Sequence, residues 1–158
     1  MNIIIKEFQS KYYFQLVDVV STVLKEYNFT FDVGDIKNDL NLLKEKKSYN
    51  KKNEKFWIAL DEDKVIGSIA IRQREDDDLA ELKRFYLLPE YRGLGYGSKL
   101  YEIAEDFARK SKYSGIWLES SRKFKSAAKL YSKKGYVLIE ELENDWDDNL
   151  YEKKFGKD

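Results

Sequence analysis

The chain of 158 residues contains no cysteine and no histidine. The absence of cysteine excludes a disulfide framework and a thiol nucleophile. Together, the two absences exclude a zinc site with the usual ligands, and the lack of histidine excludes an imidazole base. Any proton transfer in this protein therefore has to use carboxylates, tyrosine, lysine or water, and no metal ion is expected.

Other missing features narrow the class of protein. Lysine plus arginine equals aspartate plus glutamate, at 29 each, so no basic field indicates a nucleic-acid partner. No apolar run approaches the ~18 residues of a membrane span, and Ile3–Ile5 is too short for the core of a signal peptide. The single proline and the scattered glycines offer no linker at which to divide the chain. We expect one soluble, cytoplasmic domain over residues 1–158, without membrane contact.

Hydrophobic periodicity predicts an alternation of strands and helices. Apolar residues recur on one helical face in residues 16–27, and residues 56–60 and 65–71 flank a tight acidic turn that is typical of a hairpin. The expected strands are 2–8, 56–60, 65–71, 79–88, 116–118, 136–140 and 150–155. The expected helices run from an N-cap at Ser10, from Gly34-Asp35 to about Lys47, from near Gly97, and through residues 124–131 to a C-cap at Gly135. This order describes one mixed α/β domain with an antiparallel meander in its first half and a β-α-β unit in its second.

The most informative segment is residues 92–97, Arg-Gly-Leu-Gly-Tyr-Gly, which we call the glycine loop. It lies between a strand that ends at Pro89 and an amphipathic helix, where glycines permit a tight bend and free helix N–H groups attract anions. The spacing to Lys99 is wrong for a P-loop. A dinucleotide fingerprint fits only in part, because Ser98 occupies the third glycine position and an antiparallel hairpin precedes the loop. A tight turn without any ligand is the remaining alternative to a phosphate-binding loop.

The glycine loop also has the pattern Arg-x-x-Gly-x-Gly after a strand that ends in Leu-Pro. With it, residues 80–97 resemble the central strand, coenzyme A loop and helix start of the GNAT superfamily of N-acetyltransferases. Residues 127–136, Ala-Ala-Lys-Leu-Tyr-Ser-Lys-Lys-Gly-Tyr, resemble the second signature of that family and follow in the expected order. The resemblance extends over nearly the whole chain. It implies an α+β fold with a mixed, mostly antiparallel central sheet of about six to seven strands, flanked by about four helices.

This resemblance implies an acetyl-CoA-dependent N-acetyltransferase, which transfers an acetyl group to a primary amine of a small molecule, protein or peptide. The pyrophosphate of coenzyme A would lie on backbone N–H groups of the glycine loop, and the pantetheine arm would pair with the central strand like an added strand. The cofactor-binding residues that the resemblance implies are Phe85, Tyr86, Leu87, Arg92, Gly93, Leu94, Gly95, Tyr96, Gly97, Ser98 and Ser126. No metal is implied, and homodimers are common in the family.

Two residues are candidates for proton transfer. Glu81 stands on the central strand where histone-type members of the family carry their general base, and Tyr131 matches the tyrosine whose hydroxyl reaches the cofactor sulfur. Each has a purely structural alternative: Glu81 as a surface carboxylate paired with Lys83 or Arg84, and Tyr131 as a core residue. The acidic turn 76–78 is expected at most to steer a cationic substrate.

Phe124 departs from the family pattern, because many members carry there an asparagine that touches the cofactor. Ser126 or the Ser120-Ser121 pair is the candidate replacement. The acceptor amine is expected between the first helices and the last hairpin, where aromatic and acidic side chains suit a cation. The residues expected to bind it are Tyr27, Phe29, Phe31, Trp57 and Trp146. Alternative functions are a non-catalytic acyl-CoA-binding module on the same fold and, with weaker support, a nicotinamide-binding oxidoreductase.

Overall fold

The computed structural model describes residues 2–32 and 35–156. Its strands are β1 (Ile3–Glu7), β2 (Lys55–Asp61), β3 (Lys64–Gln73), β4 (Leu79–Leu87), β5 (Gly115–Ser121), β6 (Val137–Glu141) and β7 (Asp148–Lys154). Its α-helices are α1 (Tyr13–Glu26), α2 (Ile36–Lys44), α3 (Tyr96–Lys110) and α4 (Lys125–Lys133), with 3₁₀ turns at Ser10–Tyr12 and Pro89–Tyr91. The order of elements expected from the sequence is confirmed, including the β2–β3 hairpin. Within the described ranges, no helix combines the length and the apolar character needed to cross a membrane.

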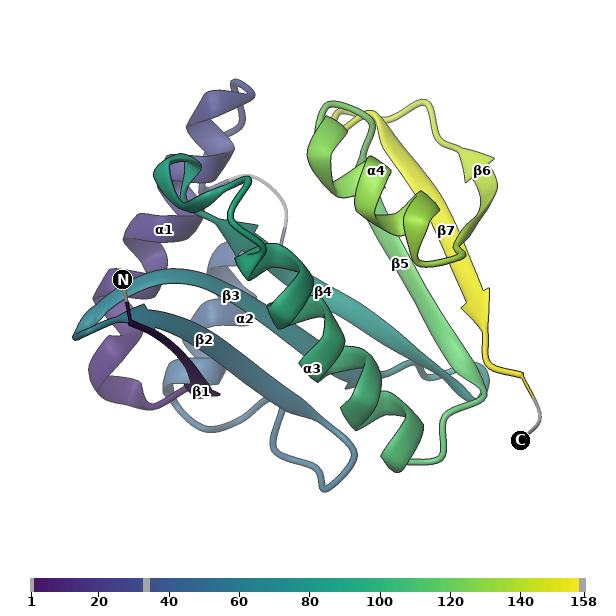
Figure 1. Cartoon of the computed structure of the whole chain (residues 1–158), viewed down its shortest axis with the longest axis horizontal. Helices are drawn as coiled ribbons and strands as arrows, with labels where there is room; N and C mark the ends of the chain where they lie inside the picture. Colours follow the sequence, from purple (N-terminus) through teal and green to yellow (C-terminus); the bar gives the residue numbers. More distant parts are fainter. Residues whose placement is uncertain (1, 33–34, 157–158) are drawn as a thin grey trace.

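All these strands form one sheet, in the order β1-β2-β3-β4-β5-β7-β6. Neighbouring strands are antiparallel except for β4 and β5. The register of this parallel pair ends at Glu81↔Trp117, although β4 continues to Leu87 and β5 continues to Ser121. The two strands therefore diverge toward their C-terminal ends, as Figure 1 shows. We call the place where they separate the β4–β5 split.

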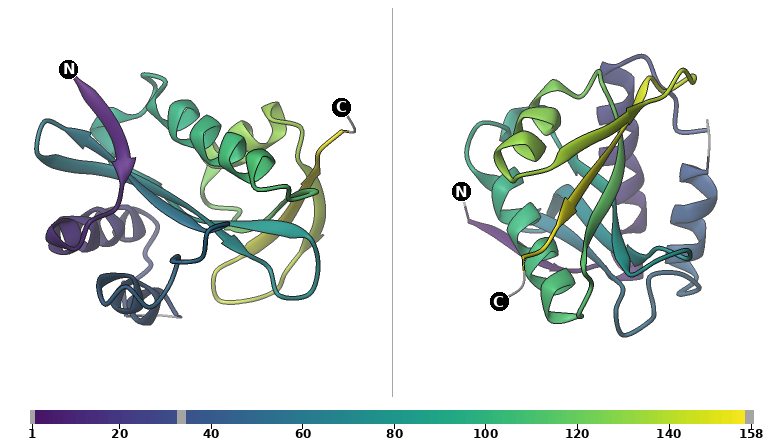
Figure 2. Two further views of the ribbon diagram at one scale, coloured as in Figure 1. Left: turned by 90° about the horizontal axis from the view of Figure 1, so that it is seen from below. Right: turned by 90° about the vertical axis from the view of Figure 1, so that its right-hand side faces the viewer.

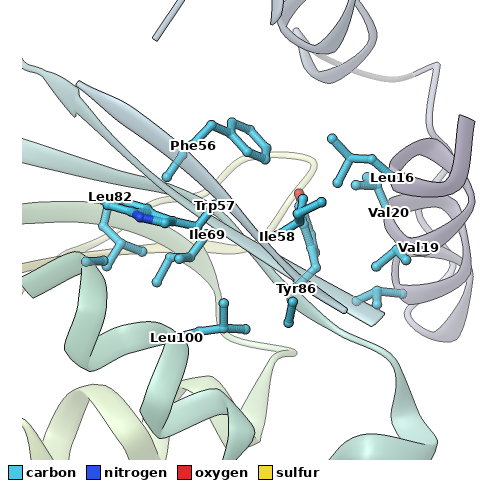
Figure 3. Close-up of a cluster of buried hydrophobic side chains, with 14 of the residues drawn as sticks. Leu16, Val19, Val20, Phe56, Trp57, Ile58, Ile69, Leu82, Tyr86 and Leu100 are labelled. Atoms are coloured by element: carbon cyan, nitrogen blue, oxygen red, sulfur yellow. The ribbon is translucent and has the colours of Figure 1, made fainter. Parts of the chain in front are cut away.

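Helices cover both faces of the sheet, and the strand side chains alternate between them. The left view of Figure 2 shows α1 and α2 on one face, with α3 and α4 on the other. In Figure 3, Leu16 and Val20 of α1 lie on the same side of the sheet as Ile58 of β2. Trp57, the sequence neighbour of Ile58, lies on the opposite side with Leu100 of α3. All five side chains are buried, so the sheet has a hydrophobic core on each face.

Two local expectations from the sequence are wrong. Ser10 is not an N-cap: its hydroxyl instead donates a 3.1 Å hydrogen bond to the carbonyl of Lys44, which joins the 3₁₀ turn before α1 to the end of α2. The second helix ends at Lys44, earlier than expected, and Lys46 just beyond it has a left-handed φ of 62°. Gly34, the expected start of that helix, lies outside the described residues, and the helix begins at Ile36.

Candidate active site

A cavity of about 980 Å³ opens at the β4–β5 split. Its wall includes Val23 of α1 and Ile36 of α2 on one face of the sheet, and Gly97 of α3 and Lys129 of α4 on the other. The cavity therefore crosses the sheet, and two ligands can enter from opposite faces and meet between the strands. Most of the site residues expected from the sequence line it. They are Tyr27, Glu81, Phe85, Tyr86, Leu87, Arg92, Gly93, Gly95, Gly97, Ser98, Ser126, Tyr131 and Trp146.

The backbone of β4 is irregular where it borders this cavity. Between the pairs Ser68↔Tyr86 and Ala70↔Lys83, β4 carries one residue more than β3, which makes a β-bulge. Arg84 in the bulge has a φ of 54°, a left-handed conformation that strains a residue with a side chain. On its other edge, the C-terminal half of β4 has no pairing with β5. This part of β4 is an open edge inside the cavity, as pairing with an extended ligand requires.

Arg84 is held in the bulge by its neighbours. Its carbonyl accepts a 2.7 Å hydrogen bond from the hydroxyl of the fully buried Ser68. Its Nε donates to Oδ2 of Asp39 at 2.8 Å, and the two side chains are only 7% and 6% exposed. The Tyr49 hydroxyl donates to the same carboxylate oxygen at 2.8 Å. Helix α2 thus fixes the strained residue, and with it the open edge of β4, through a buried ion pair.

The glycine loop presents the beginning of α3 to the cavity. Gly93 and Gly95 have φ values of 76° and 91°, which favour glycine. Helix α3 begins at Tyr96, and no side-chain hydrogen bond caps its first residue. Its first N–H groups are available to an anion, and the helix dipole adds to the attraction. Two of the loop residues expected to bind the cofactor, Leu94 and Tyr96, are not among the described residues that line the cavity. Leu94 is 53% exposed.

Arg92 links the glycine loop to α1 and β4 by hydrogen bonds. Its Nη1 and Nη2 donate to the Glu26 carboxylate of α1 at 2.9 and 2.8 Å, and its Nε donates to the Leu87 carbonyl at 2.9 Å. Because Glu26 neutralises this guanidinium, an anion in the cavity depends chiefly on the backbone N–H groups. The pairing of Glu26 with Arg92 could not be predicted from the local sequence, because the two residues are 66 positions apart.

Glu81 lines the cavity and is ion-paired. Arg72, its register partner on β3, donates to Oε1 from Nη2 at 2.9 Å and from Nε at 3.3 Å. From the sequence, a purely structural Glu81 was expected to pair with Lys83 or Arg84. The structure pairs it with Arg72 instead. Arg72 also lies 3.6 Å from Oδ1 of Asp39, so Glu81 belongs to the ionic network that holds the bulge.

A second carboxylate in the cavity wall was not among the candidates for proton transfer expected from the sequence. Glu119 of β5 and Asp148 of β7 both line the cavity. Desolvation, and after it the charge and hydrogen bond of Asp148, raises the pKa of Glu119. A carboxyl group with a raised pKa in a cleft is typical of groups that transfer protons. The described residues contain no group of three or more His, Cys, Asp or Glu that could hold a metal ion.

Tyr131 is only 3% exposed and lines the cavity from α4. Burial raises the pKa of its hydroxyl, while the Ser120 side chain beside it acts in the opposite direction. The phenol therefore stays protonated at neutral pH and can donate a proton. The structure brings Tyr131 to the core and to the cavity at once, so its packing and a catalytic role are compatible. Ser120 and Ser121 line the same cavity.

Phe124, which stands where the family pattern has asparagine, belongs to an aromatic cluster. Its ring centroid is 4.7 Å from that of Tyr27 and 6.2 Å from that of Phe29. The Phe29 ring is in turn 4.6 Å from Trp146. Tyr27, Phe124 and Trp146 line the cavity, so the cluster forms part of its wall between the end of α1 and the loop before β7.

Three residues expected at the acceptor site do not line the cavity. Trp57 is 6% exposed and packs 5.2 Å from the Phe107 ring on the α3 face. Phe31 packs against the core, and Phe29 of the aromatic cluster is only 8% exposed. None of the three is among the described residues that line the cavity. The sequence pattern around an aromatic residue does not distinguish a side chain that packs in a core from one that faces a ligand.

A family model described as "Acetyltransferase (GNAT) family" matches residues 20–136. The chain belongs to this family. Among curated proteins, this GNAT chain is similar to the "Uncharacterized N-acetyltransferase YjgM" of Escherichia coli (strain K12). The two are 32% identical over 124 residues, which cover 77% of this chain and 74% of that protein. The family, the fold and the enzyme class expected from the sequence are thereby confirmed.

Solved structures show the same GNAT architecture. An acetyltransferase from Streptococcus agalactiae 2603 is 31% identical, with a TM-score of 0.81 over 97% of this chain and 98% of that chain. A protein from Bacillus anthracis str. Ames, solved in complex with acetyl coenzyme A, is 27% identical. Its TM-score is 0.59, over 68% of this chain and 66% of that chain.

Proposed function

We propose that this protein transfers the acetyl group of acetyl-CoA to a primary amine of a small molecule or peptide. The observation that carries the proposal is the cavity through the β4–β5 split, with a helix beginning on one face and carboxylates on the other. The pyrophosphate would bind the glycine loop and the first turn of α3, and the pantetheine arm would lie along residues 85–87 of β4. Binding of acetyl coenzyme A by the Bacillus anthracis relative supports this donor.

The amine would attack the thioester carbonyl, and the C–S bond would then break to release coenzyme A. Presenting a lysine-like amine in its neutral form at pH 7 costs about 4.6 kcal/mol, so a base has to accept its proton. Glu81 and Glu119 are the two candidates. The hydrogen bonds from Arg72 occupy one oxygen of Glu81, whereas desolvation and Asp148 raise the pKa of Glu119. We propose Glu119 as the base, with Glu81 as the competing candidate.

A screen for free-thiol release from acetyl-CoA, over a panel of primary amines, tests the proposed function. We expect thiol release that depends on the amine, and a thermal shift with acetyl-CoA but not with NAD(P). A thermal shift with acetyl-CoA but no thiol release with any amine would favour the acyl-CoA-binding module instead. A shift with NAD(P) alone would favour the oxidoreductase.

Tyr131→Phe is expected to lower kcat by roughly 10²–10⁴-fold, because the thiolate that leaves the acetyl group loses its proton donor. The phenyl ring still fills the same space, so the melting temperature and the KM for acetyl-CoA should change little. The matched control is Tyr151→Phe. Tyr151 lies on β7, and its ring centroid is 5.5 Å from that of Tyr131. Steady-state kinetics of all three proteins make the comparison. Full turnover by Tyr131→Phe would remove Tyr131 as the acid.

We also propose that the protein forms a homodimer along β6, which is an edge of the sheet. Val137, Leu138 and Ile139 on this strand are 62%, 46% and 55% exposed, an apolar run beside unpaired backbone groups. Light scattering should give a dimer mass for the wild type and a monomer mass for Ile139→Lys. Ile4→Lys on the opposite edge, where Ile4 is 51% exposed, should keep the dimer mass. A monomeric wild type would refute the proposal.

A further inference from the structure

Lys83 is a partly buried, positively charged residue in the wall of the cavity. It stands on β4 two residues after Glu81, and its side chain is only 16% exposed. Within residues 2–32 and 35–156, its ammonium makes no hydrogen bond, and the one carboxylate within 4 Å is that of Asp35, at 3.8 Å. Asp35 is itself 71% exposed and lies closer to Arg84, at 3.4 Å. The positive charge of Lys83 is therefore weakly compensated.

The other charged groups nearby leave this cation with little compensation. Glu81 is engaged by Arg72, and Asp39 is engaged by Arg72 and Arg84. Desolvation and the positive charge of Arg84 lower the pKa of Lys83, while Glu81 and Asp35 act in the opposite direction. A desolvated ammonium without a close anion is costly, and an anion that enters the cavity would relieve this cost.

A negative group stands across the split from Lys83. Glu81 and Trp117 are the last paired residues of β4 and β5, and Lys83 and Glu119 follow two positions later on their respective strands. Because side chains alternate along a strand, Lys83 lies on the face of Glu81, and Glu119 lies on the face of Trp117. Lys83 is close enough to act on Glu119 electrostatically, yet the two do not come within 4 Å as an ion pair in the described part of the chain. The strands diverge here, so opposite charges line the two walls of one cavity.

We propose that Lys83 binds the carboxylate of the acceptor while Glu119 and Asp148 receive its amine, so that the acceptor is a free amino acid. This inference rests on the proposed function, because it names the substrate of the same site. A zwitterion complements a cation and a carboxylate pair on facing walls, whereas a simple amine leaves Lys83 without an anion. An internal or N-terminal amine of a protein lacks the neighbouring carboxylate and leaves it unpaired as well. Lys83 is then a specificity-determining residue, and it takes no part in proton transfer.

The test compares each amino acid with two analogues that differ only at the carboxylate. Phenylalanine, phenylalanine amide and 2-phenylethylamine form one such set, and leucine, leucine amide and 3-methylbutylamine form a second. We expect the wild type to prefer the acids, as measured by kcat/KM from thiol release. Lys83→Met should lower the ratio of kcat/KM for acid over amide by roughly 10–100-fold, the range for losing a hydrogen bond to a charged group.

Two further variants separate the charge of Lys83 from its packing. Lys83→Arg keeps the charge and should retain most of the preference for acids. Lys110→Met is the matched control, because Lys110 is 77% exposed at the end of α3 and pairs only with the exposed Asp106 in the described structure. It should leave the ratio at the wild-type value. If Lys83→Met does not fold, the wild-type panel and Lys83→Arg still decide the question.

Several outcomes would overturn the inference. They are a wild type that uses amides and decarboxylated amines as well as acids, a Lys83→Met ratio equal to that of the wild type, or a Lys83→Arg variant that has lost the preference. If no acceptor releases thiol, the proposed function fails, and calorimetry with the protein and coenzyme A then decides about Lys83. Amino-acid binding that is absent, or equally tight in Lys83→Met, would refute the site. Binding that Lys83→Met weakens at least about tenfold would support it.

Discussion

Asp39→Ala is expected to lower the free energy of unfolding by about 3–5 kcal/mol, the range for breaking a buried ion pair by removing one partner. Arg84 would keep its charge at a site where its side chain is 7% exposed, and the nearest remaining carboxylate is the exposed Asp35 at 3.4 Å. Tyr49 would lose the acceptor of its hydroxyl, which lies 2.8 Å from Asp39. For a domain of this size, the melting temperature should fall by roughly 6–20 °C.

Urea unfolding of the wild type and the variant measures this effect. Asp106→Ala is the matched control, since it removes the carboxylate of an ion pair of similar length, 2.9 Å, in which both side chains are more than half exposed. Its cost should stay below about 0.5 kcal/mol. Equal stability of Asp39→Ala and Asp106→Ala would mean that the buried network does not support the fold.

The same variant should damage the site as well as the fold. Arg84 has a left-handed φ of 54°, and its side chain and carbonyl are held by Asp39 and Ser68. Without Asp39, the bulge is free to relax toward a regular strand, which would alter the open edge of β4. We therefore expect the KM for acetyl-CoA to rise in Asp39→Ala at temperatures where the variant is still folded.

The parts of the site that depend on local chemistry could be predicted from the sequence. The glycine loop follows from glycines that adopt a positive φ before a helix, and its position at the cavity agrees with this. Gly135 was expected to end the helix α4, and it does so with a φ of 90°. The order of strands and helices also follows from periodicities of two and 3.6 residues. In each case the relevant atoms lie within a few residues of one another.

The parts that the sequence did not reveal depend on contacts between distant segments. Arg84 and Asp39 are 45 residues apart, and Arg92 and Glu26 are 66 residues apart. Glu119 meets Asp148 only because β7 inserts between β5 and β6 in the sheet. One charged side chain offers many equally plausible partners in a sequence with 29 charges of each sign. The same lack of three-dimensional information explains why Trp57 was expected at the acceptor site although it packs in the core.

Glu119→Gln is expected to lower kcat/KM by about 10²–10⁴-fold at pH 7.5, the range for losing a general base. In the wild type, kcat/KM should fall on the acid side as Glu119 gains a proton, with a midpoint above the ordinary value for glutamate. The reason is that desolvation and the Asp148 charge raise the pKa of Glu119. The variant should lose this acid limb and keep its affinity for acetyl-CoA.

Stability distinguishes this loss from a failure to fold. Because the pKa of Glu119 is higher in the folded protein than in the unfolded chain, the ionised side chain disfavours folding. The contribution of Glu119 to the free energy of unfolding is fully present below the pKa that this residue has in the unfolded chain. It is lost as the pH rises through the higher pKa that Glu119 has in the folded protein. Glutamine cannot ionise, so Glu119→Gln should be at least as stable as the wild type at pH 7.5. A less stable variant would assign the lost activity to structure.

Glu81→Gln is the discriminating partner in this comparison. It removes the charge that pairs with Arg72 at 2.9 Å but leaves the Glu119–Asp148 pair in place. If Glu119 is the base, Glu81→Gln should retain the acid limb of the pH profile, with a smaller loss of kcat/KM than Glu119→Gln. A Glu81→Gln variant that loses the acid limb, beside a Glu119→Gln variant that keeps it, would transfer the role of base to Glu81. Loss of the limb in neither variant would assign proton removal to water.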